Sequence, residues 1–203
     1  MKIRWGVCAI GIALTASLPV LAGNEATNTN TVSSTLAVNV NVVKAIRLTL
    51  TQGTQCTITA GANPDFTMNF GTVDALGISN ASCGSKFAPA APGTDPAKYY
   101  SDYKLTPTFT GQSSGGAITA YVSSDFATAA GLLSVVQADS LPGSSVNLNP
   151  MSTNVASQTS IGTSLTNNAP ITRYIGVSVA PINGSGTLTG AAAATVTYTL
   201  TAP

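Results

Sequence analysis

The hydrophobic pattern of this chain is dominated by one long alternating run, residues 36–50. Every even position in the run is aliphatic except Lys44, and the odd positions are mostly small or polar. Successive side chains of a β-strand point to opposite faces, so the run predicts a strand with one apolar face and one wetter face. Such a strand would span roughly 50 Å, whereas ordinary strands have about five or six residues. An exposed strand of this kind promotes aggregation unless something receives it.

We interpret the run as two halves that meet at Lys44. The apolar positions of the first half are Leu36, Val38, Val40 and Val42, and those of the second half are Ile46, Leu48 and Leu50. We expect the first half to be donated to another copy of the protein and the second half to stay in its own sheet. The alternative is one bent first strand that crosses between two sheets of a monomer. The polar residues 23–33 before the run and the scarcity of charge favour donation.

Shorter β-like runs, separated by Gly- and Pro-rich turns, follow this segment. They cover residues 55–60, 66–70, 103–110, 117–123, 132–136, 171–180, 187–189 and 195–201. Asn183-Gly184 between two of them is typical of a hairpin turn. We expect residues 84–98 to form the longest loop and residues 138–170 another irregular stretch. Since no segment of ten or more residues has a convincing helical period, the pattern predicts an all-β fold, a single Ig-like β-sandwich.

The first 22 residues have the features of a secretory signal peptide. A basic start at Lys2 and Arg4 precedes an apolar stretch, residues 7–14, and small residues precede Gly23. We therefore expect residues 1–22 to be removed, residues 23–43 to form an extension with the donor strand, and residues 44–203 to form the domain. A retained N-terminal anchor is the alternative. Nothing later approaches the twenty apolar residues of a membrane-spanning helix, so stable membrane insertion is not expected.

Charge is scarce along the whole chain. Charged residues make up 7% of the sequence, against about 25% in ordinary soluble proteins. Without the signal peptide, six basic and seven acidic side chains remain, a net charge near −1. With no basic excess, nucleic acid and anionic lipid are not expected partners. A low net charge also gives weak protection against self-association, which suits a chain that assembles with its own copies.

The residue types needed for catalysis are mostly missing. Without histidine there is no Ser-His-Asp arrangement and no imidazole ligand. The aspartates are scattered singly, mostly beside turn residues, although two carboxylates that meet only in space remain an alternative. We expect no enzyme activity, no catalytic residues, no cofactor and no metal site. Tyr99, Tyr100 and Tyr103 form an aromatic cluster for which packing is the favoured role; the alternative function is a monomeric secreted module that binds carbohydrate with these rings.

The mature chain keeps two cysteines, Cys56 and Cys83. An even count in an exported protein predicts one disulfide, formed in an oxidising compartment. The alternative, a two-thiolate metal site, lacks further ligands because the chain has no histidine. The disulfide would close a loop of roughly 28 residues and contribute about 3–4 kcal/mol in the chain-entropy model.

Three motifs along the chain have a family resemblance. Residues 56–59 read CTIT, residues 68–74 read MNFGTVD, and a second cysteine follows at position 83. This order resembles the N-terminal half of the spore-coat-U-like domain, which is shared with subunits of archaic chaperone–usher pili. Residues 194–200 resemble the C-terminal strand of that family, although Ala202-Pro203 depart from its usual ending. The resemblance covers residues 36–83 and 171–203, and the middle of the chain fits poorly.

The resemblance implies a pilin that lacks one strand of its sandwich. The N-terminal extension of the next subunit fills the open groove by β-strand addition, which produces a homopolymeric cell-surface filament for adhesion or biofilm formation. It also implies secretion through the periplasm, with a periplasmic chaperone and an outer-membrane usher as partners. The donated side chains are then Leu36, Val38, Val40 and Val42, whose burial is worth on the order of 6–12 kcal/mol as an upper estimate. Another class of donor-strand filament is the remaining alternative.

Overall fold

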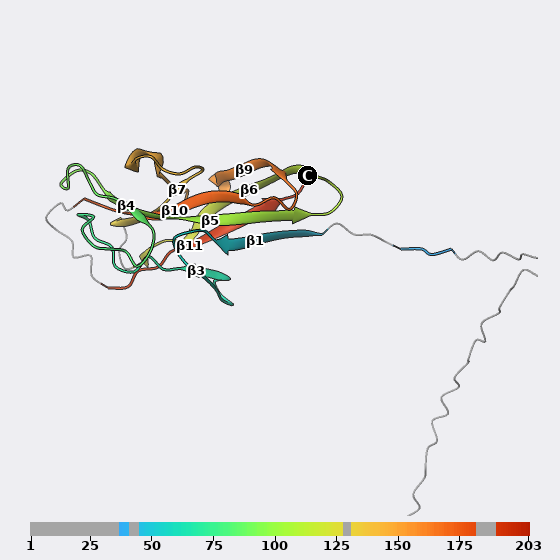
Figure 1. Ribbon diagram of the computed structural model, residues 1–203, viewed down its shortest axis with the longest axis horizontal. Helices are drawn as coiled ribbons and strands as arrows, with labels where there is room; N and C mark the ends of the chain where they lie inside the picture. The colour runs from blue at the N-terminus through green and yellow to red at the C-terminus, as the bar shows by residue number, and fades with distance from the viewer. Residues whose placement is uncertain (1–36, 41–44, 128–130, 182–189) are drawn as a thin grey trace, which may run out of the picture. The chain divides into compact units, whose positions relative to one another are not determined.

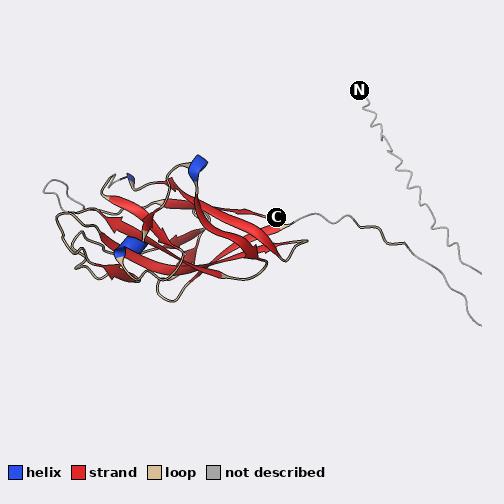
Figure 2. Ribbon diagram, turned by 90° about the horizontal axis from the view of Figure 1, so that it is seen from above, coloured by secondary structure: helices blue, strands red, loops and turns tan. Residues whose placement is uncertain are grey.

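The computed structural model describes residues 37–40, 45–127, 131–181 and 190–203. The chain divides into two units, residues 1–42 and 43–203. The second unit is nearly all β, with several antiparallel sheets, and the helix in its described residues is limited to short turns such as Ser145–Asn147 and Val155–Ser157 (Figure 2). The predicted all-β class is therefore confirmed.

The larger sheet is built around the long strand β5 (Ala97–Phe109). Its order is β1 (Ile46–Gln52), β5, β10 (Ile171–Val179), β7 (Leu133–Ala138) and β8 (Asn149–Pro150). The short strand β4 (Ser85–Phe87) pairs with the beginning of β5, and β1 pairs with its second half. Because β10 occupies the other edge of β5, β1 and β4 lie on one edge, toward opposite ends of the strand (Figure 1).

The second sheet has three strands, in the order β11 (Thr195–Thr201), β6 (Ser114–Ser124) and β9 (Thr159–Thr166). A separate hairpin is formed by β2 (Ile58–Ala60) and β3 (Phe66–Met68). Both large sheets contribute to one hydrophobic core. On β6 the buried side chains follow the strict period of two, with Ile118, Ala120 and Val122 pointing inward toward Tyr103 and Leu105 of the larger sheet.

Two predicted loops contain strands. Residues 84–98, expected to be a loop, contain β4 and the first residues of β5, which starts six residues before the predicted Tyr103. The alternation is hidden there because both faces of β5 are covered: Tyr99 faces the main core, while Tyr100 packs on the other face with Val136. Residues 138–170 contain β8 and β9. β9 was missed because only Ile161 and Leu165 of its eight residues are buried, and its pairing register shifts along the strand.

Among the described residues of the long alternating run, only those of its second half form a strand. Residues 37–40 belong to no strand, and Val38 and Val40 are 76% and 77% exposed. Ile46, Leu48 and Leu50 lie in β1, paired with β5 of their own sheet as predicted. Leu48 and Leu50 pack against the core, whereas Ile46 is 55% exposed. Several predicted features lie outside the described residues: Leu36, Val42, Lys44, the signal peptide 1–22, the leader 23–33, the Asn183-Gly184 turn and the run 187–189.

Candidate functional site: the seam between β1 and β11

Two strands that end their sheets lie beside each other in the fold. Among the described strands, β1 pairs only with β5, and β11 pairs only with β6. Each strand therefore has one edge that no described strand occupies, and the two strands are spatial neighbours (Figure 1). A strand edge of this kind presents backbone N–H and C=O groups that can pair with a further strand.

The core-facing side of β1 is incompletely covered. Cross-strand partners in an antiparallel pair point to the same side of the sheet. Ile46, Leu48 and Leu50 pair with residues of β5 that are all fully buried: Phe109, Pro107 and Leu105. The three residues of β1 face the same side, yet Ile46 is exposed and the other two are only half-buried. The hydrophobic core is thus closed over β5 and open over β1.

β11 shows the same contrast. Its core-facing residues are Val196, Tyr198 and Leu200, and their partners on β6 are Val122, Ala120 and Ile118. The partners are at most 4% exposed, whereas the residues of β11 are half-buried. We call the six core-facing residues of these two strands the β1–β11 seam: Ile46, Leu48, Leu50, Val196, Tyr198 and Leu200. A period-2 apolar strand has the side-chain pattern that would cover it.

The start of β1 is tied to β5. The Ala45 N–H donates to Thr110 Oγ1 at 2.9 Å, and the Thr110 N–H donates to the Ala45 carbonyl at 3.0 Å. These bonds extend the pairing of β1 with β5 by one residue, to Ala45, on the N-terminal side of Ile46. The chain is therefore in extended pairing with β5 from Ala45 onward.

The end of β1 is held by a buried carboxylate. Asp102 of β5 is 6% exposed and accepts hydrogen bonds from the Thr54 N–H and Oγ1, and from the Gln55 N–H, at 2.8–3.2 Å. Gly53 leaves room for this contact, because a Cβ at that position would lie 2.2 Å from Asp102 Cγ. Both ends of β1 are thus hydrogen-bonded to β5 or to the residue that follows it, and no described strand occupies the other edge of β1.

A tyrosine pair joins the two sheets at the seam. The Tyr198 hydroxyl on β11 donates to the Tyr103 hydroxyl on β5 at 3.0 Å, and the two rings lie 5.9 Å apart. Burial raises the pKa of Tyr103 to about 12, although the hydrogen bond with Tyr198 opposes that rise. Burial also raises the pKa of Tyr198 well above its ordinary value. Both hydroxyls therefore remain protonated, and the contact is a neutral hydrogen bond.

The disulfide fastens the segment that follows β1. Cys56 and Cys83 are bonded, as the sequence predicts, with their Cα atoms 5.0 Å apart. Cys56 is 2% exposed, and its N–H donates to Ser101 Oγ on β5. A disulfide is compatible with a secreted protein. Among the described residues, no helix is long and apolar enough to cross a membrane.

The three clustered tyrosines are packing residues. Tyr99, Tyr100 and Tyr103 are 0%, 6% and 1% exposed. The ring of Tyr100 stacks on Phe87 at 5.3 Å and meets Tyr174 edge-on at 6.3 Å. Burial leaves no ring face of this cluster open for stacking on a sugar.

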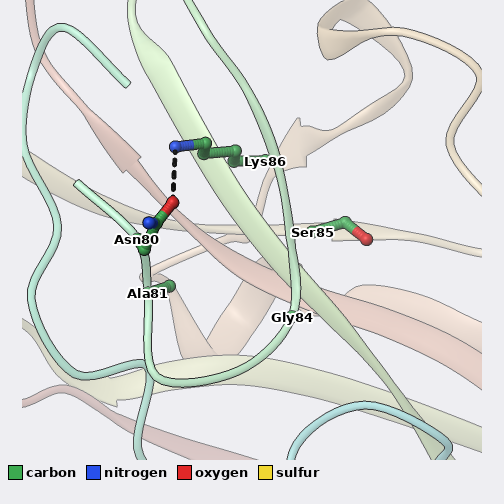
Figure 3. Close-up of a pocket in the computed structure, with 5 residues that line it drawn as sticks. All are labelled: Asn80, Ala81, Gly84, Ser85 and Lys86. Atoms are coloured by element: carbon green, nitrogen blue, oxygen red, sulfur yellow. Dashed lines mark hydrogen bonds between the residues drawn. The ribbon is translucent and has the colours of Figure 1, made fainter. Parts of the chain in front are cut away.

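A shallow hollow lies beside β4, and the ammonium group of the lysine that lines it is already hydrogen-bonded within the chain. It is lined by Asn80, Ala81, Gly84, Ser85 and Lys86 (Figure 3). The Lys86 ammonium donates to the carbonyls of Ile78 and Ser79 and to Asn80 Oδ1, at 3.0–3.4 Å. Its three protons thus have three acceptors within the chain. Over the described part of the sequence, no group of three or more His, Cys, Asp or Glu side chains is placed to hold a metal ion.

The predicted site residues and the residues of the seam differ in how far the sequence revealed them. Val38 and Val40 of the predicted donor strand are exposed, and Leu36 and Val42 lie outside the described residues. Residues 195–201, predicted as a β-like run, form β11. Nothing in the sequence showed that β11 ends its sheet beside β1, nor that Tyr198 reaches Tyr103.

Comparison with protein-family models, with curated proteins and with solved structures finds no match to this chain.

Proposed function

We propose that this protein is the structural subunit of a cell-surface filament that assembles by donor-strand exchange. The observation that carries the proposal is the β1–β11 seam, where two neighbouring strand edges leave the hydrophobic core partly uncovered. In the proposed assembly the Ig-like sandwich of one subunit lacks a strand, and residues 36–42 of the next subunit supply it. Val38 and Val40 are exposed, so their apolar side chains are available to be buried in the seam of another copy.

The donor segment matches the seam in length and pattern. β1 and β11 each have seven residues, and the donor segment from Leu36 to Val42 also has seven. Its four even side chains would face the core while Asn39 and Asn41 face outward. Its backbone would pair on both edges, so that main-chain hydrogen bonds supply affinity and the alternating side chains set the register.

Insertion of the segment into its own seam is disfavoured. Such an insertion needs a chain reversal between Val42 and Ala45, because Ala45 is already paired with Thr110. Only Val43 and Lys44 lie between Val42 and Ala45. Neither is a Gly, Pro, Asn or Asp, the residues on which tight turns depend, and Val43 is β-branched. Donation to another copy needs no reversal.

The assembly route and the biological role follow from the resemblance to chaperone–usher pilins. A periplasmic chaperone would cover the seam before assembly, and an outer-membrane usher would export the growing filament. The filament would then serve adhesion or biofilm formation at the cell surface. The alternative, a monomeric carbohydrate-binding module, needs exposed aromatic rings, and the tyrosines from which we expected it to be built are buried.

The test compares polymers before and after boiling. We expect the mature chain to give an SDS ladder that boiling collapses to monomer, and thin fibres by negative-stain microscopy. Val40→Asp should abolish both, because a charge on the donated face cannot be buried without a partner. Asn41→Asp adds the same charge on the outward face and is the matched control that should still polymerise. Deletion of residues 23–43 should also abolish assembly; a single monomer band and no fibres from the unaltered mature chain would refute the proposal.

A further inference from the structure

The loop of residues 74–80 presents apolar side chains to solvent. Leu76 is 39% exposed and Ile78 is 72% exposed, whereas the neighbouring Ala75 is 6% exposed and belongs to the core. Single exposed aliphatic residues are common on protein surfaces. Here, however, both lie on one loop whose backbone is hydrogen-bonded to the side chains of Asp74 and Lys86.

The loop is held between a negative and a positive side chain. The Asp74 carboxylate accepts hydrogen bonds from the N–H groups of Leu76, Ile78 and Ser79. The Lys86 ammonium donates to the carbonyls of Ile78 and Ser79. Since the backbone is already ordered in the free protein, contact through Leu76 and Ile78 would lose little conformational entropy on association.

The loop lies at the end of the fold opposite to the start of β1. The Tyr99 hydroxyl, near the beginning of β5, donates to the Asp74 carbonyl at 3.2 Å, and Lys86 on β4 pairs with Tyr99. β1 starts where β5 ends, because Ile46 pairs with Phe109 (Figure 1). We call these two ends of the second unit the loop end and the β1-start end. The β5–β6 turn, residues 110–113, lies at the β1-start end.

Filament growth determines at which end a donated strand must leave its acceptor. β1 runs toward the loop end and β11 runs away from it, as their registers on β5 and β6 show. A donated strand parallel to β11 would leave at the β1-start end, where the acceptor's own extension also begins. Two copies could then exchange strands reciprocally and close as a dimer. An open chain of subunits therefore requires the donated strand to leave at the loop end.

The connection between subunits is short. From Val42 to Ala45 the chain advances three residues, which span at most about 11 Å. The β1-start end of the donor subunit is thus held beside the loop end of its acceptor. We propose that loop 74–80, through Leu76 and Ile78, packs against the next copy of this chain at Ala45 and the β5–β6 turn. This inference rests on the proposed donor-strand function and adds a second contact at each joint.

Cross-linking within the polymer tests the contact. The mature chain carrying Ile78→Cys and Gln112→Cys, two exposed positions at opposite ends of the fold, is treated with a short bismaleimide. We expect the ladder to survive boiling, because the linker joins neighbouring subunits at each joint. The matched control carries Leu141→Cys with Gln112→Cys. Leu141 is 67% exposed but follows β7, which is separated from β1 by two strands of the sheet.

Each outcome decides between the two proposals. A boiling-resistant ladder from the first pair alone supports the contact. In a second outcome, both pairs of cysteines give a ladder before boiling and only monomers after it. This result overturns the contact but still supports donor-strand exchange. Equal cross-linking of both pairs also overturns the contact, because it shows no preference for the loop. No ladder before boiling, or a dimer alone, overturns filament assembly and with it this inference.

Discussion

The hydroxyls of Tyr103 and Tyr198 form a 3.0 Å hydrogen bond that connects the two sheets. Tyr103 lies in the middle of β5, and Tyr198 lies on β11, which ends the smaller sheet. Tyr198 also belongs to the β1–β11 seam. The pair therefore fixes the position of β11, on which the accessibility of the seam depends.

We expect Tyr198→Phe to destabilise the protein by about 1–3 kcal/mol, because it leaves the Tyr103 hydroxyl buried without its partner. The double change Tyr103→Phe with Tyr198→Phe should cost less than the sum of the two single changes, since no hydroxyl is then left unpaired. Urea unfolding of the three variants measures the difference. Tyr121→Phe, a half-buried tyrosine on the neighbouring strand β6, is the control; strict additivity of the pair would contradict the prediction.

The same pair should make the fold sensitive to alkali. Burial raises the pKa of Tyr103 to about 12 in the folded protein, against about 10 in an unfolded chain. The folded state thus holds this proton more tightly than the unfolded chain does. The stability that protonated Tyr103 contributes to the fold is therefore complete below about pH 10 and is lost as pH rises toward 12. We expect the urea midpoint to fall more steeply above pH 10 in the unaltered protein than in the doubly substituted variant. Parallel pH profiles would show that the pair does not control alkaline stability.

Gly53 should tolerate no side chain. The Cβ of Gly53→Ala would lie 2.2 Å from Asp102 Cγ and displace the carboxylate that fixes Thr54. We expect a loss of about 1–3 kcal/mol from this overpacking, read from thermal unfolding. Gly93→Ala is the matched control, because a Cβ there meets nothing within 4 Å. Equal effects of the two changes would show that the Asp102 contact is unimportant.

Loss of the disulfide should weaken the fold without removing the seam. Replacing Cys56 and Cys83 together by Ser opens a link between residues separated by 27 positions, which predicts a loss of about 3–4 kcal/mol from chain entropy. The unfolding midpoint with and without reductant measures the effect. Because the disulfide lies beyond the end of β1, polymers should still form under conditions where the variant is folded. An unchanged midpoint would contradict the prediction.

Asp74 should contribute stability that disappears in acid. Burial opposes its ionisation, but hydrogen bonds from Ser79, Ile78 and Leu76 outweigh that effect and hold its pKa below the usual 3.8. The stability that the ionised Asp74 carboxylate contributes is therefore complete above about pH 4 and is lost as pH falls below that value. We expect Asp74→Asn to be less stable than the unaltered protein at pH 7, and the difference to shrink toward pH 2. Asp125→Asn is the control; a pH-independent difference would exclude the carboxylate as its cause.

Much of the β structure could be read from the sequence because alternation survives wherever a strand has one buried and one exposed face. β11 occupies residues 195–201 as expected, and β10 ends one residue before its predicted limit. β4 and the start of β5 were missed, because Tyr100 is covered by Phe87 and Tyr174 on the face that alternation assigns to solvent. β9 was missed because its Ser- and Thr-rich residues form an irregular edge.

The sequence by itself determined the class of fold, the disulfide and the presence of an alternating segment ahead of β1, since these depend on local pattern and on cysteine count. Only the tertiary structure decided which strands end the sheets, because neighbours in a sheet are set by pairing between distant residues. It placed β1 beside β11, left their core-facing residues half-covered, and buried the tyrosines that a sugar-binding surface would need. The seam is a property of that pairing, because it lies where the edge strands of the two sheets are neighbours.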